Sequence, residues 1–436
     1  MISANRRESI IGSLRRGTVP NAGLDALAVG IDAFAPSLDA ELKSIAAGGG
    51  AFKAVRGDYG SGKTFFGRWL QERARSQGFA TSEVQISETE TPLHRMETVY
   101  RRLVERLGTS DSTQGAFRSV IDGWFYALEQ DVLADGSLDP NDAQQLLART
   151  EELMEARLAG VNKFAPAFSG VLRAYRRAQA SGDTSMADGL IAWLAGQPNV
   201  AAGVKRAAGV KGDLDHFGAS NFLAGLLVIL RDSGYSGLVW VLDEVETLQR
   251  MRGDTREKGL NALRQWIDEI DAGRFPGLYL IATGTPAFFD GPQGVQRLAP
   301  LAQRLHTDFA TDRRFDNPRA PQIRLAPFDA SALLAVGRRV RDLFADGQPQ
   351  EARLRTVVTD GYIETLAQAV TGQLGGKVGV APRLFLKKLV ADVLDRVELH
   401  EDFDPRRHYA LTLSESELTV QERAAAAAAS VDDIEL

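Results

Sequence analysis

The chain has 436 residues, which is too long for one ordinary hydrophobic core and fits about two or three domains. Apolar residues make up 44% of the chain and charged residues 25%, as is usual for soluble globular proteins. The absence of cysteine excludes disulfides and cysteine-ligated metals and favours a cytoplasmic setting. The net charge of −6 argues against non-specific coating of nucleic acid, although a local basic patch could still bind it.

No segment is expected to enter a membrane. The N-terminal stretch "MISANRRESIIGSLRRGTVP" has basic residues but no long apolar segment after them, so it is not predicted to be a signal peptide. The longest apolar run, "FLAGLLVIL" at 222–230, is too short to cross a bilayer of about 30 Å as a helix. The five histidines show no spacing typical of metal ligands.

The first third of the chain alternates helical and extended patterns. Residues 49–57, "GGAFKAVRG", are typical of a short buried strand, and residues 64–78 have apolar positions at helical spacing up to a plausible capping glycine, Gly78. A second strand is predicted at 81–87 and a helix at 91–108. Residues 109–215 differ, because they contain long amphipathic helical patterns and no strong strand signal. We expect them to form a mostly helical insertion.

One stretch of the insertion leaves two interpretations open. Residues 200–215, "VAAGVKRAAGVKGDLD", are rich in glycine and alanine and locally basic. They fit a flexible connector, or a loop that contacts DNA or a partner protein.

After the insertion, strands and helices alternate again. A helix is predicted up to Gly234, and "GLVWVLDE" at 237–244 is a continuous apolar run typical of a central parallel strand. A helix at 256–273, a strand at 277–286 and a last strand at 321–329 follow. This alternation predicts an α/β fold with a parallel sheet flanked by helices.

The remainder of the chain is predicted to be helical. Residues 330–413 fit a helical lid, in which "HYALTLS" at 408–414 is one extended patch that could be a strand of a winged-helix-like domain. The end of the chain, 414–436, is of low complexity and is expected to be a frayed helix or disordered.

The sequence "GDYGSGKT" at 57–64 matches the phosphate-loop pattern G-x-x-x-x-G-K-[ST] between a predicted strand and a predicted helix. Glycines let several backbone N–H groups point into one concavity, and the helix presents its positive end to the anion. Lys63 is expected to reach the β- and γ-phosphates, and Thr64 to bind Mg²⁺. The predicted nucleotide-binding residues of this stretch are Gly57, Tyr59, Gly60, Ser61, Gly62, Lys63, Thr64 and Phe65.

Two carboxylates lie at the end of the apolar strand predicted at 237–244. Asp243 at the end of "LVWVLDE" is placed to hold Mg²⁺ beside Thr64, and Glu244 to orient and deprotonate an attacking water. This pair favours ATP hydrolysis over a GTP switch. The alternative is that Glu244 and Glu246 form a solvated acidic turn.

The next strand ends in "ATGTP", where Thr283 or Thr285 could hydrogen-bond the γ-phosphate or the lytic water. The alternative is an ordinary threonine in the turn before Pro286.

Arginines after that strand are candidates for compensating charge during phosphoryl transfer. Arg304 in "LAPLAQRLHTDF" could project to the γ-phosphate of a neighbouring subunit, and Arg313 and Arg314 compete for this role. Arg383 in "GVAPRLFLKKL" could reach back to the phosphates from the lid. For each of them the alternative is a solvated surface arginine.

The order of phosphate loop, "LDE" strand, "TGT" strand, "QRL" and a lid "PR" resembles an AAA+ ATPase of the group that includes origin-recognition initiators and transposition or secretion ATPases. The resemblance implies that Thr285 is the better sensor candidate and Arg304 the better arginine finger, which would require a homo-oligomer. It also implies that Val29 and Gly30 lie beside the adenine. The insertion is longer than in a minimal AAA+ module, which puts a simple transfer of ring geometry in doubt.

A closer resemblance covers most of the chain. The stretches "IIGSLRRGTVPNAGLDALAVGID", "FKAVRGDYGSGKTFF", "VQISETETPLHRMETVYRRL" and "VLDEVETL" are similar to the ATP-binding proteins of bacterial BREX phage-defence systems, the BrxD-like group. The resemblance implies an intracellular ATPase that works with other defence proteins, such as a helicase or another DNA-acting partner. The expected domains are an N-terminal helical segment with the adenine-side loop (1–48), a P-loop core with its insertion (49–329), the lid (330–413) and the tail (414–436).

Three functions are therefore open. The first is an AAA+ ATPase that binds and hydrolyses Mg-ATP and acts with DNA-associated partners in phage defence. The second is a docking or regulatory module that binds ATP and hydrolyses it slowly or not at all. The third is an initiator-like loader that binds DNA itself.

Overall fold

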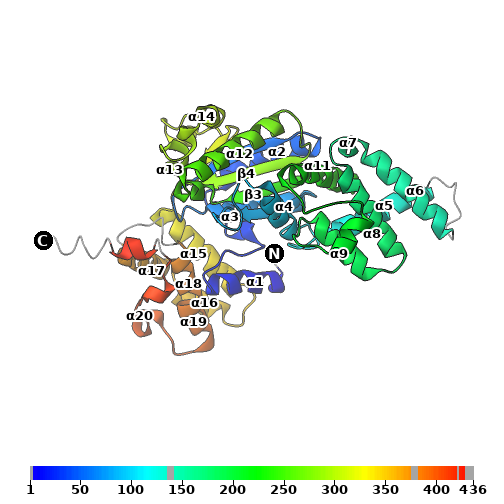
Figure 1. Cartoon of the computed structure of the whole chain (residues 1–436). Helices are drawn as coiled ribbons and strands as arrows, with labels where there is room; N and C mark the ends of the chain where they lie inside the picture. Colours follow the sequence, from blue (N-terminus) through cyan, green and yellow to red (C-terminus); the bar gives the residue numbers. More distant parts are fainter. Residues whose placement is uncertain (1–2, 135–141, 375–381, 420–421, 428–436) are drawn as a thin grey trace.

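The computed structural model of the chain describes residues 3–134, 142–374, 382–419 and 422–427. A parallel sheet flanked by helices forms its centre (Figure 1), which confirms the predicted α/β class. The sheet has five strands in the order β2-β3-β4-β1-β5, and all neighbouring strands run parallel. The strands are β1 (Ala51–Arg56), β2 (Ala80–Gln85), β3 (Leu238–Asp243), β4 (Leu278–Gly284) and β5 (Gln322–Arg324). Within the described residues, no helix combines the length and apolar character needed to span a bilayer.

The central strands are apolar along their whole length because helices cover both faces of the sheet. In β3, Leu238, Trp240 and Leu242 point into one core, whereas Val239 and Val241 point into the other. The second core is closed by α2 (Ala35–Ala46) and α3 (Lys63–Ser76). The first is closed by α4 (Met96–Glu105), α11 (His216–Asp232) and α12 (Gly253–Asp271).

The strand register places several polar residues at one edge of the sheet. Gln85 on β2 is level with Asp243 on β3, and Val55 on β1 is level with Thr283 on β4. Because all strands run parallel, their C-terminal ends meet at this edge, which is where ligands bind in open α/β sheets.

The insertion is helical in its described part, as predicted, and extends from one end of the sheet (Figure 1). Its aromatic side chains Trp124, Phe168 and Trp193 belong to the same core as α11, which fixes the insertion on the sheet. Its helices are α5 (Phe117–Ala134), α6 (Ala143–Arg157), α7 (Ala159–Asn162), α8 (Pro166–Ala180), α9 (Thr184–Leu194) and α10 (Ala202–Ala207). The basic stretch 200–215 thus contains α10, and its Lys205 pairs with Asp213 at 2.7 Å. A contact of this stretch with DNA stays a prediction.

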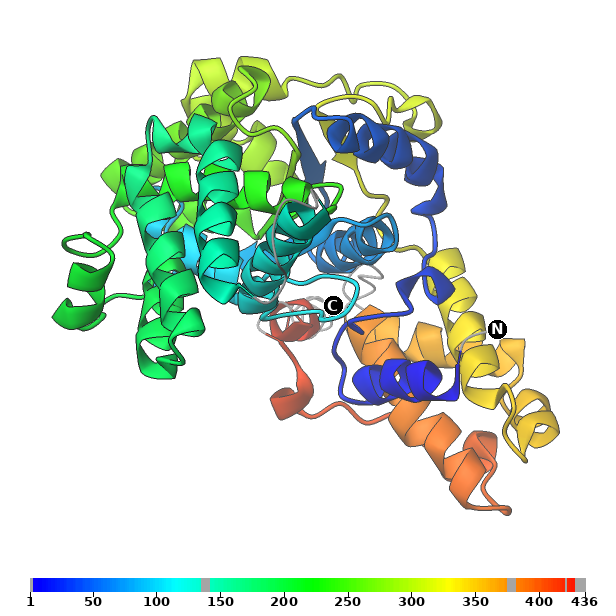
Figure 2. The same ribbon diagram turned by 90° about the vertical axis from the view of Figure 1, so that its right-hand side faces the viewer.

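The C-terminal helices form a separate core together with α1 (Ala4–Arg15), although α1 lies at the other end of the sequence (Figure 2). Ile10, Ile11 and Leu14 of α1 are buried in this core. The C-terminal helices are α15 (Ala330–Ala345), α16 (Glu351–Val357), α17 (Asp360–Gln373), α18 (Pro382–Lys387), a π-helical stretch η7 (Lys388–Leu394), α19 (Asp395–Leu399) and α20 (Pro405–His408). Segment 1–48 therefore contributes α1 to this core, whereas its second helix, α2, covers one face of the sheet.

The C-terminal residues that the structure describes contain no wing. Residues 409–414 form no strand, and no strand occurs after Arg324 in the described part of the chain. Residues 422–427 of the tail are helical, one of the two expected forms, and Leu418 and Ala425 are buried in the C-terminal core. The rest of the tail, 428–436, lies outside the described residues.

Truncation of Ile10 tests the packing of α1. Because Ile10 is fully buried, Ile10→Ala should cost about 2–5 kcal/mol of local stability. Hydrogen exchange should then rise in residues 382–399 while amides of β1, β3 and β4 keep their protection. The neighbouring Ser9→Ala, at an exposed position, is the control. Faster exchange in the sheet alone would contradict the assignment of α1 to the C-terminal core.

Candidate functional site

The loop that matches the phosphate-loop pattern, here called the phosphate loop, connects β1 to α3, and two of its glycines have a backbone conformation that side chains disfavour. They are Gly60 with φ +77° and Gly62, directly before the first residue of α3, with φ +89°. At Gly57, a Cβ atom would lie 2.2 Å from Ser61 Oγ, so the Ser61 side chain would have to turn away from a larger residue. The loop therefore closes tightly over the N-terminus of α3, whose free N–H groups attract anions.

Lys63 is the first residue of α3, and its side chain is buried. Its Nζ donates to the carbonyl oxygens of Gly57 at 2.9 Å and of Asp58 at 3.2 Å. The Tyr59 ring centroid lies 5.2 Å away. The ammonium group is thus held by two carbonyl oxygens of the loop, with an aromatic ring beside it.

Thr64 and Asp243 meet directly. Thr64 Oγ1 donates to Asp243 Oδ2 at 2.9 Å, and Thr283 donates to the other carboxylate oxygen of Asp243. The three residues come from α3, β3 and β4, so the hydrogen bonds tie the phosphate loop to the middle of the sheet. Mg²⁺ is usually bound through one or two carboxylates, substrate phosphates and waters, and this hydroxyl and carboxylate fit such a site.

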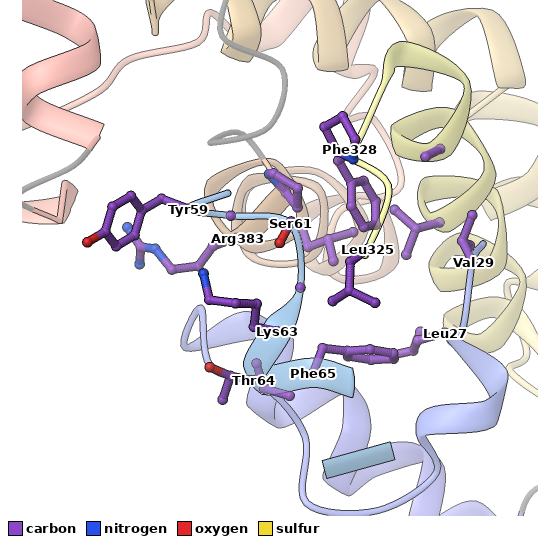
Figure 3. Close-up of a pocket in the computed structure, with 18 of the residues that line it drawn as sticks. Leu27, Val29, Tyr59, Ser61, Lys63, Thr64, Phe65, Leu325, Phe328 and Arg383 are labelled. Atoms are coloured by element: carbon purple, nitrogen blue, oxygen red, sulfur yellow. The ribbon is translucent and has the colours of Figure 1, made fainter. Parts of the chain in front are cut away.

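A cavity of about 620 Å³ opens beside the loop. Figure 3 shows Lys63, Thr64, Ser61, Tyr59 and Arg383 on one side of it. Apolar side chains line the other side, and they are Leu27, Val29, Phe65, Leu325 and Phe328. A ligand with an anionic end and a flat apolar end matches this division.

The chain between α1 and α2 supplies residues on the apolar side of the cavity. Glu72 on α3 accepts from the backbone N–H groups of Gly23 at 2.7 Å and Leu24 at 2.8 Å, which anchors this chain to the phosphate-loop helix. Val29 and Gly30 follow and line the cavity, together with Gly60 and Gly62 of the loop. Gly57 is not among the lining residues.

Glu244 is exposed rather than buried in the site. Its backbone has φ 59°, a left-handed conformation that is rare outside glycine. Gln85 Nε2 donates to Glu244 Oε2 at 2.9 Å, so the carboxylate is held toward β2. This hydrogen bond follows from the register that sets Gln85 level with Asp243.

Glu246 is a buried carboxylate of the site, as Asp243 is, with 4% of its surface exposed. Its Oε1 lies 3.8 Å from Lys63 Nζ, and its Oε2 is buried without a hydrogen-bond partner among the described residues. Burial raises the pKa of Glu246, and the charge of Lys63 opposes this effect only in part. Glu246 also lines the cavity, so the sequence-based alternative of a solvated acidic turn fits Glu244 but not Glu246.

The remaining candidates lie at different distances from the cavity. Arg383 lines it, whereas Thr285 is buried at the start of α13 (Pro286–Asp290) and does not. Arg304 on α14 (Ala299–Leu305) pairs with Asp268 and donates to Pro300 O at 2.8 Å. The exposed residues Arg313 and Arg314 follow on a short 3₁₀ helix.

Sequence reasoning missed Gln85 and undervalued Glu246. Neither belongs to a motif in the sequence, because Gln85 gains its role only from strand pairing and Glu246 from the turn that follows Glu244. The available signal is the three-residue spacing of Val245 and Leu248 in "LDEVETL", which indicates a helical turn after the strand, with Glu246 next to its buried side.

The chain was compared with known proteins. Residues 2–413 match the model of a protein family described as BREX system ATP-binding protein BrxC/D. No curated protein and no solved structure gives a significant match.

The burial of Glu246 predicts a pH-dependent cost to stability. Because the folded protein holds the Glu246 proton more tightly than the unfolded chain does, stability is lost as pH rises above the ordinary carboxyl range. Glu246→Gln should therefore unfold a few degrees above wild type at about pH 7, and the two should converge near about pH 4. Thermal unfolding across this range, with the exposed Glu257→Gln as control, measures the difference. A difference in unfolding temperature between Glu246→Gln and wild type that does not change with pH would contradict this account.

Proposed function

Because the chain belongs to the BREX system ATP-binding protein BrxC/D family, we propose that it is an AAA+ P-loop ATPase that binds and hydrolyses Mg-ATP in phage defence. The family supports ATP binding and a role in BREX defence. The observation that carries the rest of the proposal is the 2.9 Å hydrogen bond between Thr64 and Asp243, beside Lys63 and a divided cavity.

In the proposed complex, Lys63 leaves the loop carbonyls and binds the β- and γ-phosphates, while the N–H groups of the loop and of α3 hold their oxygens. Thr64 Oγ1 and the Asp243 carboxylate hold Mg²⁺, which supplies charge compensation when bound. The adenine lies between Phe65, Val29 and Gly30 on the apolar side.

Glu244 is the proposed general base. Its carboxylate leaves Gln85 and accepts a proton from the water that attacks the γ-phosphorus, and the bond to the β-phosphate oxygen breaks. Thr283, already bonded to Asp243, keeps that carboxylate oriented. Thr285, which the AAA+ resemblance implies as the sensor, is the proposed hydrogen-bond partner of the γ-phosphate or of the lytic water.

The proposed nucleotide site lies between the sheet and the C-terminal helices. We therefore propose that a change from bound ATP to bound ADP moves these helices as a lid, through the contact of Arg383 with the phosphates. An arginine from a second copy completes the site in a homo-oligomer. All three candidate arginines are exposed, but Arg304 pairs with Asp268 and Arg314 with Asp312 within their own subunit, which favours Arg313. The output passes to other defence proteins in the cytoplasm, such as a helicase that acts on DNA.

A second candidate function is favoured by the position of Glu244. Glu244 lines the cavity, but its carboxylate is engaged by Gln85, which fits a docking module that binds ATP and turns it over slowly. An initiator-like loader has less support, because residues 409–414 form no wing strand. DNA affinity measured against salt concentration tests that third function, since phosphate contacts give a steep slope.

Two substitutions separate binding from hydrolysis. Lys63→Ala removes the phosphate-binding cation and should weaken ATP binding by about 10–100-fold. Glu244→Gln should keep ATP affinity and lower single-turnover hydrolysis by about 10²–10⁴-fold, as expected on loss of a general base. Measurements of ATP affinity, hydrolysis and particle size with and without ATP, on wild type and both variants, test these effects together.

Wild-type turnover in Glu244→Gln would exclude this residue as the base. Absence of turnover in wild type, with and without DNA and the neighbouring defence proteins, would favour the docking module.

Release of Glu244 from Gln85 gives a separate prediction. Gln85→Ala removes one hydrogen bond worth ~1 kcal/mol, so the single-turnover rate should rise roughly fivefold at unchanged ATP affinity. Gln144→Ala, at an exposed site in the insertion, is the control. A lower rate in Gln85→Ala would mean that Gln85 positions Glu244 for the reaction instead of restraining it.

A further inference from the structure

The described part of the tail, residues 414–419 and 422–427, is docked on the helix that carries Arg383. We call these residues the tail segment. Leu418 and Ala425 anchor it in the C-terminal core. The tail segment lies beyond residues 2–413, which match the family, so its contacts are a feature of this chain beyond the family match.

Glu422 is the most buried carboxylate of the tail segment, with 2% of its surface exposed. Arg383 Nε donates to Glu422 Oε1 at 2.9 Å, and Arg383 Nη2 donates both to Glu422 Oε2 and to the backbone oxygen of Glu417 at 2.6 Å. Glu422 Oε2 also accepts from Thr419 N at 2.6 Å, and Glu422 N donates to Thr419 Oγ1 at 3.3 Å. Thr419 and Glu422 thus exchange the two hydrogen bonds of a capping box.

Glu417 makes a second set of ion pairs on the same helix. Lys387 Nζ lies 2.8 Å and Lys388 Nζ 3.0 Å from its carboxylate oxygens. Burial alone would raise the pKa of Glu417, but the hydrogen bonds from both lysines outweigh burial and lower the pKa to about 2. The tail segment therefore neutralises three successive cations of helix 382–394.

These contacts reach the nucleotide cavity. Arg383, Thr419 and Glu422 all line it, together with Lys63 and the phosphate loop. Arg383 is one of two cations among the described lining residues, and the other is Lys63. Its Nε and Nη2 are the same donors that would bind two oxygens of a phosphate side-on.

We propose that Glu422 is an internal anion that competes with a nucleotide phosphate for Arg383, so that docking of the tail segment and binding of phosphate oppose each other. The proposal rests on the proposed function, in which Arg383 faces the phosphates. Two negative groups cannot share these donors at full strength, because each desolvates and repels the other.

The coupling is reciprocal. If docking of the tail segment weakens phosphate binding, bound ATP weakens docking of the tail segment by the same factor. A partner that captured residues 414–427 would then raise the affinity for ATP, and the tail segment would report the nucleotide state to that partner.

The test compares Glu422→Gln with the exposed control Glu401→Gln and uses two ligands. Glu422→Gln keeps the shape of the side chain and removes its charge. The dissociation constant of Mg-ATP should fall about tenfold in Glu422→Gln and stay at the wild-type value in Glu401→Gln, a change typical of one partly buried charge contact. Adenosine, which has no phosphate to reach Arg383, should bind both variants and wild type equally.

A second measurement needs no variant. Hydrogen exchange of residues 422–427 in wild type should become faster when Mg-ATP is added and stay unchanged when adenosine is added. If Glu422 only stabilised the fold, Mg-ATP and adenosine would have the same effect on hydrogen exchange in residues 422–427.

Equal ATP affinity in Glu422→Gln and wild type, or exchange in the tail segment that slows with ATP, would overturn the competition. Weaker ATP binding in Glu422→Gln would also overturn it, since Glu422 would then position Arg383 for the phosphate. If neither ATP nor adenosine binds any of the three proteins, the proposed function itself fails and the competition fails with it.

Discussion

The hydrogen bond between Thr64 Oγ1 and the Asp243 carboxylate is the interaction on which the site depends, because it joins the first turn of α3 to the end of β3. One strand, β4, lies between β3 and the strand that carries the phosphate loop. Thr283 at the end of β4 binds the second oxygen of the same carboxylate, so three elements converge on one group. The parallel register makes this possible, since β1, β3 and β4 all end at the same edge of the sheet and the loop after β1 leads there into α3.

Two ion pairs involving buried carboxylates surround the cavity. Lys63 faces Glu246 at 3.8 Å, and Arg383 is held by Glu422. Both carboxylates are almost fully buried, and the desolvation of such groups is costly unless a cation compensates it. In the competition proposed above, a polyphosphate would take both cations from these partners and release Glu422. Binding at this site and rearrangement of the C-terminal region would then be parts of one equilibrium.

Much of the sheet could be predicted from the sequence because its central strands are apolar on both faces. The short apolar runs "LVWVLD" and "LYLIATG" are typical of buried parallel strands, and the phosphate-loop pattern predicts that a helix begins directly after it. The position of α1 could not be predicted, since the amphipathic pattern of a helix does not say which core receives its apolar face. The same limit applies to Gln85, which reaches Glu244 only through strand pairing, and to Glu422, whose partner Arg383 is far away in sequence. The alanine-rich composition of the tail allowed the helix at 422–427 to be expected but not the burial of Leu418 and Ala425, since composition does not say which core receives a side chain.

The dependence of ATP affinity on Mg²⁺ in wild type and Asp243→Asn tests the central claim most directly. If Thr64 and Asp243 hold the metal ion of bound ATP, adding Mg²⁺ should tighten ATP binding in wild type and have little effect in Asp243→Asn, which keeps the shape of the side chain but loses its charge. An equal effect of Mg²⁺ on both proteins would contradict the assignment of this pair as the metal site.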